Sequence, residues 1–288
     1  MRIDRIPGWP APGTPGLFWL GQAGFWIDTG RMRVLIDPYL SDSLARKYAG
    51  QANDHRRMMP PPILPQDLPR PDVVLITHAH TDHMDPDTLG PLAARFPDLP
   101  FMVPAARLDV AQARIGAAAR LVPVDAGQTH VSAPDLTVQV FPAAHESVET
   151  DAEGRHVYLG YGVIAGAIRL YHSGDCIPFD GLLALLRGFR PNIALLPVNG
   201  RDPVRLAAGI PGNFTMDEAV ALTRSVGASV LVPHHFGMFS FNTCETSVID
   251  QAAFAEREVT ILRPVVGETL RPEMDGSDGN GSSAHHSG

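Results

Sequence analysis

A short segment rich in histidine and aspartate offers the strongest chemistry in the sequence. It reads Ile76-Thr-His78-Ala-His80-Thr-Asp82-His83-Met-Asp85 and ends a continuous apolar run that is typical of a buried strand. His78 and His80, two residues apart at a strand end, project to the same side and reach one cation. Asp82 and His83 follow where the chain turns away, so we expect them to face a neighbouring cation. Imidazole and carboxylate ligands without thiolates suit Zn²⁺, Mn²⁺ or Fe²⁺.

Three later segments place further candidate ligands at the ends of strand-like runs. They are Val140-Phe-Pro-Ala-Ala-His145, Arg169-Leu-Tyr-His-Ser-Gly-Asp175 and Val230-Leu-Val-Pro-His234-His235. A single histidine at a strand end also serves as a cap or a hydrogen-bonding group, and a histidine-rich loop without metal is the alternative for the first motif. Strand ends of an α/β fold converge on one edge, however, and desolvated imidazoles need a compensating partner. The pattern therefore favours a shared metal centre.

The elements that must position these residues alternate between strands and helices. An irregular lead-in to Pro15 is expected, then an antiparallel meander over 17–37, a loop-like stretch over 41–69 with a short helix at 44–48, and a buried strand over 72–77. Later strands are expected at Leu136–Ala143, Val157–Ile164, Ala167–His172, Ile193–Val198 and Ser229–Pro233. Helices are expected from Asp87 and at Ala105–Ala113, Gly181–Arg187, Thr215–Ser225 and Ser247–Arg257. A terminal hairpin is expected from Thr260–Arg263 and Glu268–Arg271.

Length and composition limit the class of protein. The chain has 288 residues, and 23 Lys and Arg against 31 Asp and Glu leave a net charge of −8. This balance argues against a nucleic-acid or anionic-membrane surface. We expect a small-molecule substrate as partner, and a homo-oligomer is left open. Two cysteines cannot build a disulfide framework or a cysteine-based zinc site, and no signal peptide or membrane span is evident, so we expect a cytoplasmic protein. One domain is expected over 1–274, with a low-complexity, disordered tail over 275–288.

The motifs together resemble the metallo-β-lactamase superfamily of metallohydrolases, over most of the chain. Trp19-Leu-Gly21, Asp37-Pro-Tyr39, Thr77–Asp85, Tyr171-His-Ser-Gly-Asp175 and Pro233-His-His235 are similar, more narrowly, to the L-ascorbate-6-phosphate lactonase (UlaG-like) branch. The resemblance implies an α/β fold, a four-layer αββα sandwich in which two sheets pack face to face with helices outside and the metals at one edge.

The same resemblance implies a ligand set for two divalent metal ions, Zn²⁺ or Mn²⁺. His78, His80 and His145 would hold the first ion, Asp82, His83 and His235 the second, and Asp175 would bridge them. His235 is preferred to its neighbour because His-Phe-Gly-Met-Phe matches the family pattern, which leaves His234 beside the ligands as a candidate substrate contact.

The implied reaction is hydrolysis by a hydroxide held between the two metals, which would open a lactone or hydrolyse an ester of a small sugar acid, with or without a phosphate. Asp82 and Asp175 are the candidate catalytic residues that orient the nucleophile. Asn199 and Arg201 follow a strand-like run and are candidate substrate contacts, since a guanidinium pairs with phosphate or carboxylate. A surface ion pair between Arg201 and Asp202 is the alternative.

Three other functions compete with this interpretation. A metal-dependent phosphodiesterase would keep the same centre. A flavodiiron-type redox enzyme carries Glu in place of His80, as H-x-E-x-D-H, and needs a glycine-rich flavin-binding segment that the sequence lacks. A metal-stabilised binding protein without turnover would need metals that are saturated and closed to solvent.

Overall fold

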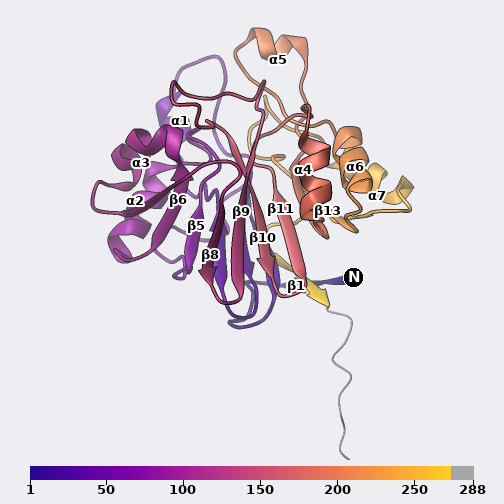
Figure 1. The fold of residues 1–288 in the computed structure, drawn as a ribbon. Helices are drawn as coiled ribbons and strands as arrows, with labels where there is room; N and C mark the ends of the chain where they lie inside the picture. The colour runs from indigo at the N-terminus through magenta and orange to yellow at the C-terminus, as the bar shows by residue number, and fades with distance from the viewer. Residues whose placement is uncertain (274–288) are drawn as a thin grey trace, which may run out of the picture.

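A computed structural model describes residues 1–273, and in this range the strands form two sheets that pack face to face (Figure 1). The eight-stranded sheet of residues 1–273 has the order β1-β15-β2-β3-β4-β5-β6-β7, and the seven-stranded sheet has the order β14-β13-β12-β11-β10-β9-β8. Strands β4 to β7 run parallel, as do β11 to β14. Ligands carried at the carboxyl ends of such strands therefore meet at one edge.

The strands of the eight-stranded sheet are β1 (Arg2–Pro7), β2 (Gly16–Gly21), β3 (Gly24–Asp28), β4 (Arg33–Ile36), β5 (Val73–Leu75), β6 (Pro100–Pro104), β7 (Arg120–Val124) and β15 (Glu268–Glu273). The strands of the second sheet are β8 (Thr129–Ala133), β9 (Leu136–Pro142), β10 (Leu159–Ala165), β11 (Ile168–His172), β12 (Ile193–Pro197), β13 (Val230–His234) and β14 (Thr260–Ile261). The helices are α1 (Ser43–Lys47), α2 (Pro86–Arg95), α3 (Leu108–Ile115), α4 (Leu182–Phe189), α5 (Pro203–Ala207), α6 (Met216–Ser225) and α7 (Thr246–Ala255), with a 3₁₀ turn at Ala105–Arg107.

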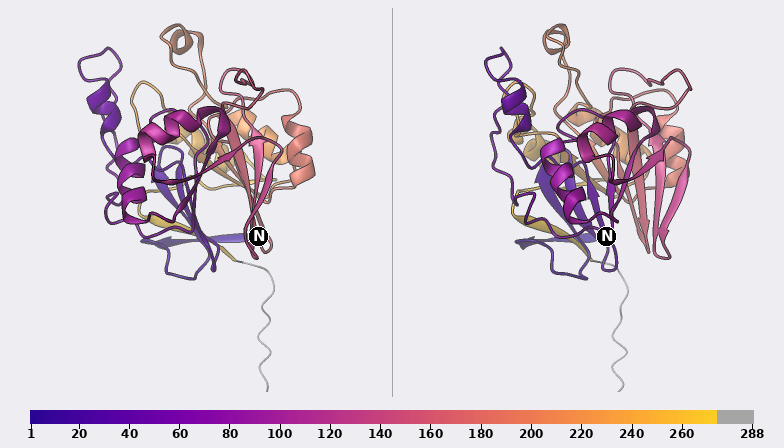
Figure 2. Two further views of the ribbon diagram at one scale, coloured as in Figure 1. Left: turned by 60° about the vertical axis from the view of Figure 1, so that its left-hand side comes forward. Right: turned by 90° about the vertical axis from the view of Figure 1, so that its left-hand side faces the viewer.

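Side-chain alternation along the strands builds the four layers. In β4 and β5, Val34, Ile36, Val73 and Leu75 face the second sheet, whereas the intervening residues face outward. The outward faces are covered by α2 and α3 on one sheet and by α4, α6 and α7 on the other, as Figures 1 and 2 show. The structure therefore confirms the αββα sandwich.

The meander, the short α1 helix and the strands that precede each predicted ligand are all present. The chain start corrects one expectation, because Arg2–Pro7 forms an edge strand instead of an irregular lead-in. Its backbone pairs antiparallel with β15, a partner more than 260 positions away that local sequence patterns do not show. The predicted terminal hairpin is also wrong, since β14 pairs with β13 in one sheet and β15 pairs with β1 and β2 in the other. The predicted tail over 275–288 lies outside the described residues.

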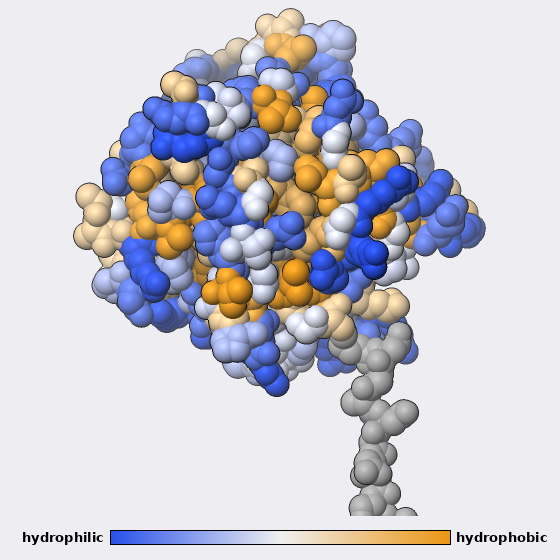
Figure 3. Space-filling model, in the orientation of Figure 1, coloured by the Kyte–Doolittle hydropathy of each residue, from blue (hydrophilic) through white to orange (hydrophobic). Residues whose placement is uncertain are grey.

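The most exposed large apolar side chains lie on different elements. Val131, Val204 and Phe254 are each more than 70% exposed and belong to β8, α5 and α7 respectively. The face in Figure 3 is accordingly a mosaic of hydrophilic and hydrophobic residues. No helix in the described part of the chain has the length and apolarity needed to cross a membrane. The α5 segment and α1 lie at the end of the sandwich opposite the N-terminus (Figures 1 and 2), and this is the end at which the predicted ligands meet.

Candidate metal centre

Strand ends from both sheets deliver the predicted ligands to one place. The histidine motif follows β5 in the first sheet, whereas His145, Asp175 and His235 follow β9, β11 and β13 in the second. Close packing of the two sheets requires Gly174, at φ +63°, because a Cβ atom there would lie 2.8 Å from Thr77 Cβ, which follows β5 of the other sheet. The glycine before Asp175 therefore allows the close approach of the segment after β5 to this strand end.

The seven predicted ligands form two adjoining groups. One group holds His78, His80, His145 and Asp175, and the other holds Asp82, His83 and His235; within each group the ligand atoms all lie within 4.8 Å of one another.

Asp175 faces both groups. Its Oδ2 lies 3.5 Å from His145 Nε2 in the first group. Its Oδ1 lies 3.3 Å from His83 Nε2 and 3.2 Å from His235 Nε2 in the second. One carboxylate is thus placed to contact two neighbouring cations.

Unpartnered ligand atoms provide a test of whether cations fit. Among residues 1–273, His78 Nε2 is buried and has no hydrogen-bond partner, and His83 Nε2 and Asp175 Oδ1 are buried with no hydrogen bond beyond the ion-pair contacts given above. Burying such atoms without a partner is costly, and a cation in each group would supply the missing interaction. Imidazole and carboxylate donors suit divalent first-row metals, so the residues present fit the implied ions.

The electrostatics of the two groups differ. Burial lowers the pKa of His145 to about 4 and holds the pKa of His78 well below its usual value. Both imidazoles are therefore neutral at pH 7 and have a lone pair for a metal. Burial also acts to lower the pKa of His235, but Asp175 and Asp82 outweigh it and raise that pKa to about 9. In the protein alone, a proton on His235 thus balances the carboxylates.

A buried aspartate behind the ligands was not among the predicted site residues. Asp37 Oδ2 lies 2.7 Å from His83 Nδ1 and also accepts a hydrogen bond from the Thr77 hydroxyl, while Asp37 Oδ1 accepts from the Thr77 amide at 2.8 Å. A carboxylate on Nδ1 fixes the imidazole tautomer that directs Nε2 toward a metal. The signal that points to Asp37 is its position directly after β4, the strand that pairs with β5.

The geometry separates the two adjacent histidines. His235 Nε2 lies 3.7 Å from Asp82 Oδ2 and faces the ligands, with its backbone in the left-handed region at φ +61°. His234 is fully buried and stacks on His172 at 4.7 Å between ring centroids, on the far side of the strand end. It does not line the cavity over the ligands, so we remove it from the candidate substrate contacts.

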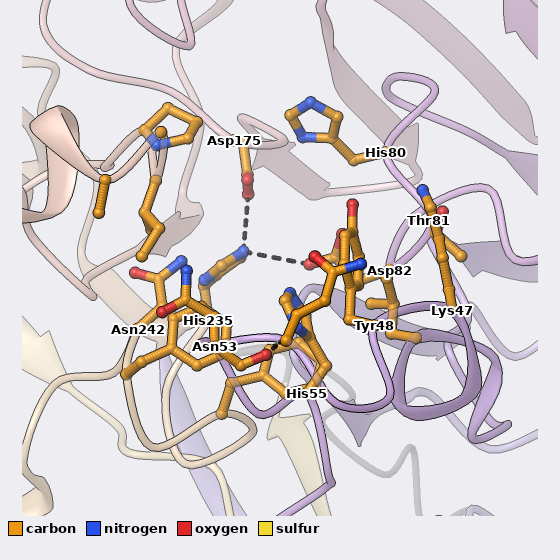
Figure 4. A pocket seen from close by; sticks show the side chains of 18 of the residues that line it. Lys47, Tyr48, Asn53, His55, His80, Thr81, Asp82, Asp175, His235 and Asn242 are labelled. Carbon is orange, nitrogen blue, oxygen red and sulfur yellow. Dashed lines mark hydrogen bonds and ion pairs between the residues drawn. The ribbon is translucent and has the colours of Figure 1, made fainter.

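A cavity of about 450 Å³ opens above the two groups (Figure 4). Its floor includes ligands from both groups, and its walls come from residues 44–55, the end of α3, the segment after α5 and residues 239–242. Figure 4 shows Asp175 and Asp82 on either side of His235, with Lys47 and Thr81 to one side and Asn242 to the other. The candidate ligands are therefore accessible to a small molecule.

Two other predicted substrate contacts lie outside this lining. Arg201 forms a two-pronged ion pair with Glu218, at 2.6 Å for each nitrogen, which corrects both the substrate contact and the alternative pair with Asp202. Asp202 instead caps α5. Asn199 is buried and donates to Asn242 Oδ1, so it supports a lining residue from behind. Sequence reasoning did not single out Lys47 or Arg114, which do line the cavity.

Comparison with known proteins agrees with the geometry. A family model described as a beta-lactamase superfamily domain matches residues 32–236. A UPF0173 metal-dependent hydrolase from Aeropyrum pernix is 28% identical over 238 residues, which cover 77% of this chain and 83% of that protein.

Solved structures share the fold at lower sequence identity. Igni18, a metallo hydrolase from Ignicoccus hospitalis, is 21% identical, has a TM-score of 0.66, and is matched over 90% of this chain and 99% of its own. An isothiocyanate hydrolase from Delia radicum gut bacteria is 19% identical, has a TM-score of 0.71, and is matched over 89% of this chain and 100% of its own. With the family model covering most of the chain, the chain belongs to the metallo-β-lactamase superfamily of metal-dependent hydrolases.

Proposed function

We propose that the protein opens a lactone, or hydrolyses an ester, of a small sugar acid that carries a carboxylate or a phosphate. The observation that carries this proposal is the shared Asp175 on the floor of an open cavity, with three histidines on one side and Asp82, His83 and His235 on the other. The Aeropyrum relative is a metal-dependent hydrolase by name, which supports hydrolysis as the reaction class.

Two divalent cations, Zn²⁺ or Mn²⁺, are the cofactors of this proposal. When bound, they would lower the pKa of a shared water molecule and polarise the substrate oxygen. The chain's own carboxylates orient that water. The imidazoles of His235 and His83 outweigh burial and hold the pKa of Asp175 well below its usual value, so Asp175 remains an ionised hydrogen-bond acceptor. Asp82, with a side chain 15% exposed to the cavity, is the second acceptor.

The charge of the cavity wall favours an anionic substrate. Among the Lys, Arg, Asp and Glu residues that line the cavity in the described part of the chain, Lys47 and Arg114 are the two that are not candidate metal ligands. Neither forms an ion pair with a carboxylate of residues 1–273, and the Arg114 guanidinium is held by the carbonyl oxygens of Ala79 and Met84. The positive charges of Lys47 and Arg114 therefore remain available for a carboxylate or phosphate on the substrate.

The rest of the wall suits a compact, hydroxylated ring. Gln51, Asn53 and Asn242 line the cavity with amides that donate to and accept from hydroxyl groups. Tyr48 and His55 stack on one another at 4.2 Å between ring centroids and give one wall a flat aromatic surface. A few polar groups beside an aromatic wall are typical of a small-molecule site.

The access to the ligands argues against a purely structural metal centre. Structural sites are closed, whereas here His80, Asp82, His145, Asp175 and His235 all line an open cavity. Solvent and substrate therefore reach ligands of both groups.

The test is a hydrolysis screen of the full chain, with and without chelator, followed by added Mn²⁺ or Zn²⁺. The panel pairs sugar-acid lactones and esters with bis(p-nitrophenyl) phosphate. We expect lactone or ester hydrolysis that the chelator abolishes and the metal restores, and His130→Ala, at a surface position remote from the ligands, serves as a control that keeps full rate. Faster turnover of the phosphodiester would replace the proposal with a phosphodiesterase. Metal-loaded protein that hydrolyses no compound of the panel would refute hydrolysis of these substrates.

A further inference from the structure

Gln22 is a buried amide beside the second group that no ligand pattern includes. It lies in the turn between β2 and β3 and has no exposed surface. Its side-chain Nε2 position lies 2.8 Å from Asp82 Oδ2 and contacts the His235 ring, at 3.0 Å from Nε2 and 3.4 Å from Nδ1. Its backbone oxygen accepts hydrogen bonds from the His235 amide, at 2.9 Å, and from Trp19 Nε1, at 3.0 Å. The turn is therefore fixed against the strand end that carries His235.

The backbone at Gln22 is held in an unfavourable conformation. Gln22 has φ +50°, and in residues 1–273 the other non-glycine residues with positive φ are Asp37, His235 and Arg190. A two-residue turn with a single left-handed central residue ordinarily has glycine at that position. Asp37 and His235 both belong to the metal centre, and Arg190 ends α4. Strain that recurs at a site indicates that the side chain, and not the turn alone, requires this geometry.

One end of the amide lacks a partner. Gln22 Oε1 is buried and has no hydrogen-bond partner within residues 1–273. Rotation by 180° about the last side-chain bond exchanges Oε1 with Nε2 and places an oxygen 2.8 Å from Asp82 Oδ2 and 3.0 Å from His235 Nε2. Neighbouring ligands of one Zn²⁺ or Mn²⁺ ion lie about 3.0 to 3.4 Å apart, given bonds of about 2.1 Å, so the separation from His235 Nε2 matches and that from Asp82 Oδ2 is slightly shorter. Two oxygens at such a separation repel each other unless a cation lies between them.

We propose that the Gln22 side-chain oxygen is an additional ligand of the cation held by Asp82, His83 and His235. The neutral amide adds no charge to that ion, and its carbonyl oxygen is a donor that suits Mn²⁺ as well as Zn²⁺. The inference rests on the metal centre of the proposed function but not on its substrate. Metal binding is therefore the measurement that tests it, and a chain that hydrolyses none of the substrates above leaves this test intact.

The experiment compares Gln22→Met and Gln22→Glu in the full chain. Methionine keeps the length of the side chain but has no oxygen, whereas glutamate keeps the oxygen and adds charge. Metal content is measured after gel filtration, Zn²⁺ and Mn²⁺ affinities by calorimetry, and the coordination of Co²⁺ by its visible absorption. Gln128→Met and Gln128→Glu, at an exposed glutamine in the turn before β8, are the matched controls.

If Gln22 is a ligand, Gln22→Met lowers the affinity for the cation of the Asp82, His83 and His235 group by about 10-fold or more and changes the Co²⁺ spectrum of that site. The cation of the other group is retained. Gln22→Glu binds the second cation at least as tightly as the unmodified chain. An unchanged Co²⁺ spectrum in Gln22→Met, or weaker binding in Gln22→Glu, would overturn the proposal and leave the amide as a hydrogen-bond donor to Asp82. Thermal melting in chelator checks folding, and if Gln22→Met does not fold, Gln22→Glu decides the question.

Discussion

The floor and the wall of the cavity are built by different means. The floor consists of candidate metal ligands at the ends of strands from two sheets, and His78, His83 and His145 there are at most 4% exposed. The wall consists of loops and helix ends, where Lys47 and Tyr48 remain partly or fully exposed. Rigid elements thus fix the chemistry, whereas surface segments fix the choice of substrate. Changes on the floor are expected to remove metal, and changes in the wall to alter substrate preference.

The largest effect that would distinguish floor from wall is expected when one histidine of each is replaced in separate variants. His78→Ala removes a buried ligand, so we expect loss of at least one metal ion per chain and a fall in rate of about 10³-fold. His55→Ala removes an aromatic ring of the wall and is expected to keep both metals, with a rate change below about 10-fold. Metal analysis together with steady-state rates measures both. Loss of metal from His55→Ala would contradict the division between floor and wall.

A second effect concerns the pH dependence of metal uptake by the floor. Despite burial, Asp175 and Asp82 raise the pKa of His235 to about 9, so the metal-free protein carries a proton there at pH 7. A cation must displace that proton, and for this group alone the affinity falls about tenfold per pH unit below 9, or about 100-fold from pH 8 to pH 6. Competition with a chelator of known affinity measures it, together with proton release. An affinity that does not change over this range would show that His235 is not protonated before binding.

Floor and wall also differ in how far the sequence predicts them. The histidine motif and the later strand-end ligands are visible because each follows an apolar run, and parallel strands bring such ends to one edge. The motif's spacing already suggested two neighbouring cations, and the family resemblance added the assignment of His145, Asp175 and His235 to them. Asp37 was missed as a functional residue because its partner His83 lies 46 positions away, in the segment that follows the neighbouring strand β5. Local patterns therefore reveal ligands more readily than the residues that orient them.

The wall was predicted poorly because loop conformation depends on distant contacts. Arg201 was expected near the substrate, but its guanidinium forms an ion pair with Glu218 on the first turn of α6. Arg114 gave no signal, since an arginine on an amphipathic helix ordinarily faces solvent, and only the packing of α3 places it over the histidine motif. Edge strand β1 was missed for the same reason, because its pairing partner β15 is remote in sequence. Non-local pairing decided each of these cases.

Asp37 tests whether the floor needs its supporting residues as well as its ligands. Asp37→Asn removes the negative charge that faces His83 Nδ1 and presents an amide that favours the wrong imidazole tautomer. We therefore expect metal affinity at the second group to fall by between about 10-fold and about 100-fold. Asp28→Asn is the matched control, because Asp28 is also buried but caps the turn at Gly30. Calorimetric titration with Zn²⁺ or Mn²⁺ measures the affinity. Equal losses in the two variants would indicate a general effect of burial instead of tautomer control.

The smallest expected effect lies in the wall and concerns Arg114. If its guanidinium binds the anionic group of the substrate, Arg114→Gln raises KM about 10-fold for a carboxylate-bearing lactone or ester and leaves kcat within about twofold, because the ligands are untouched. A neutral lactone of the same ring size should show no change in KM, and metal content should be unaltered. Arg187→Gln is the control, since Arg187 also binds a carbonyl oxygen from a helix but lies far from the cavity. A rise in KM for both substrates would mean that Arg114 supports the His78–His83 loop through Ala79. A fall in metal content would mean that Arg114 helps to hold the metal ligands of the floor.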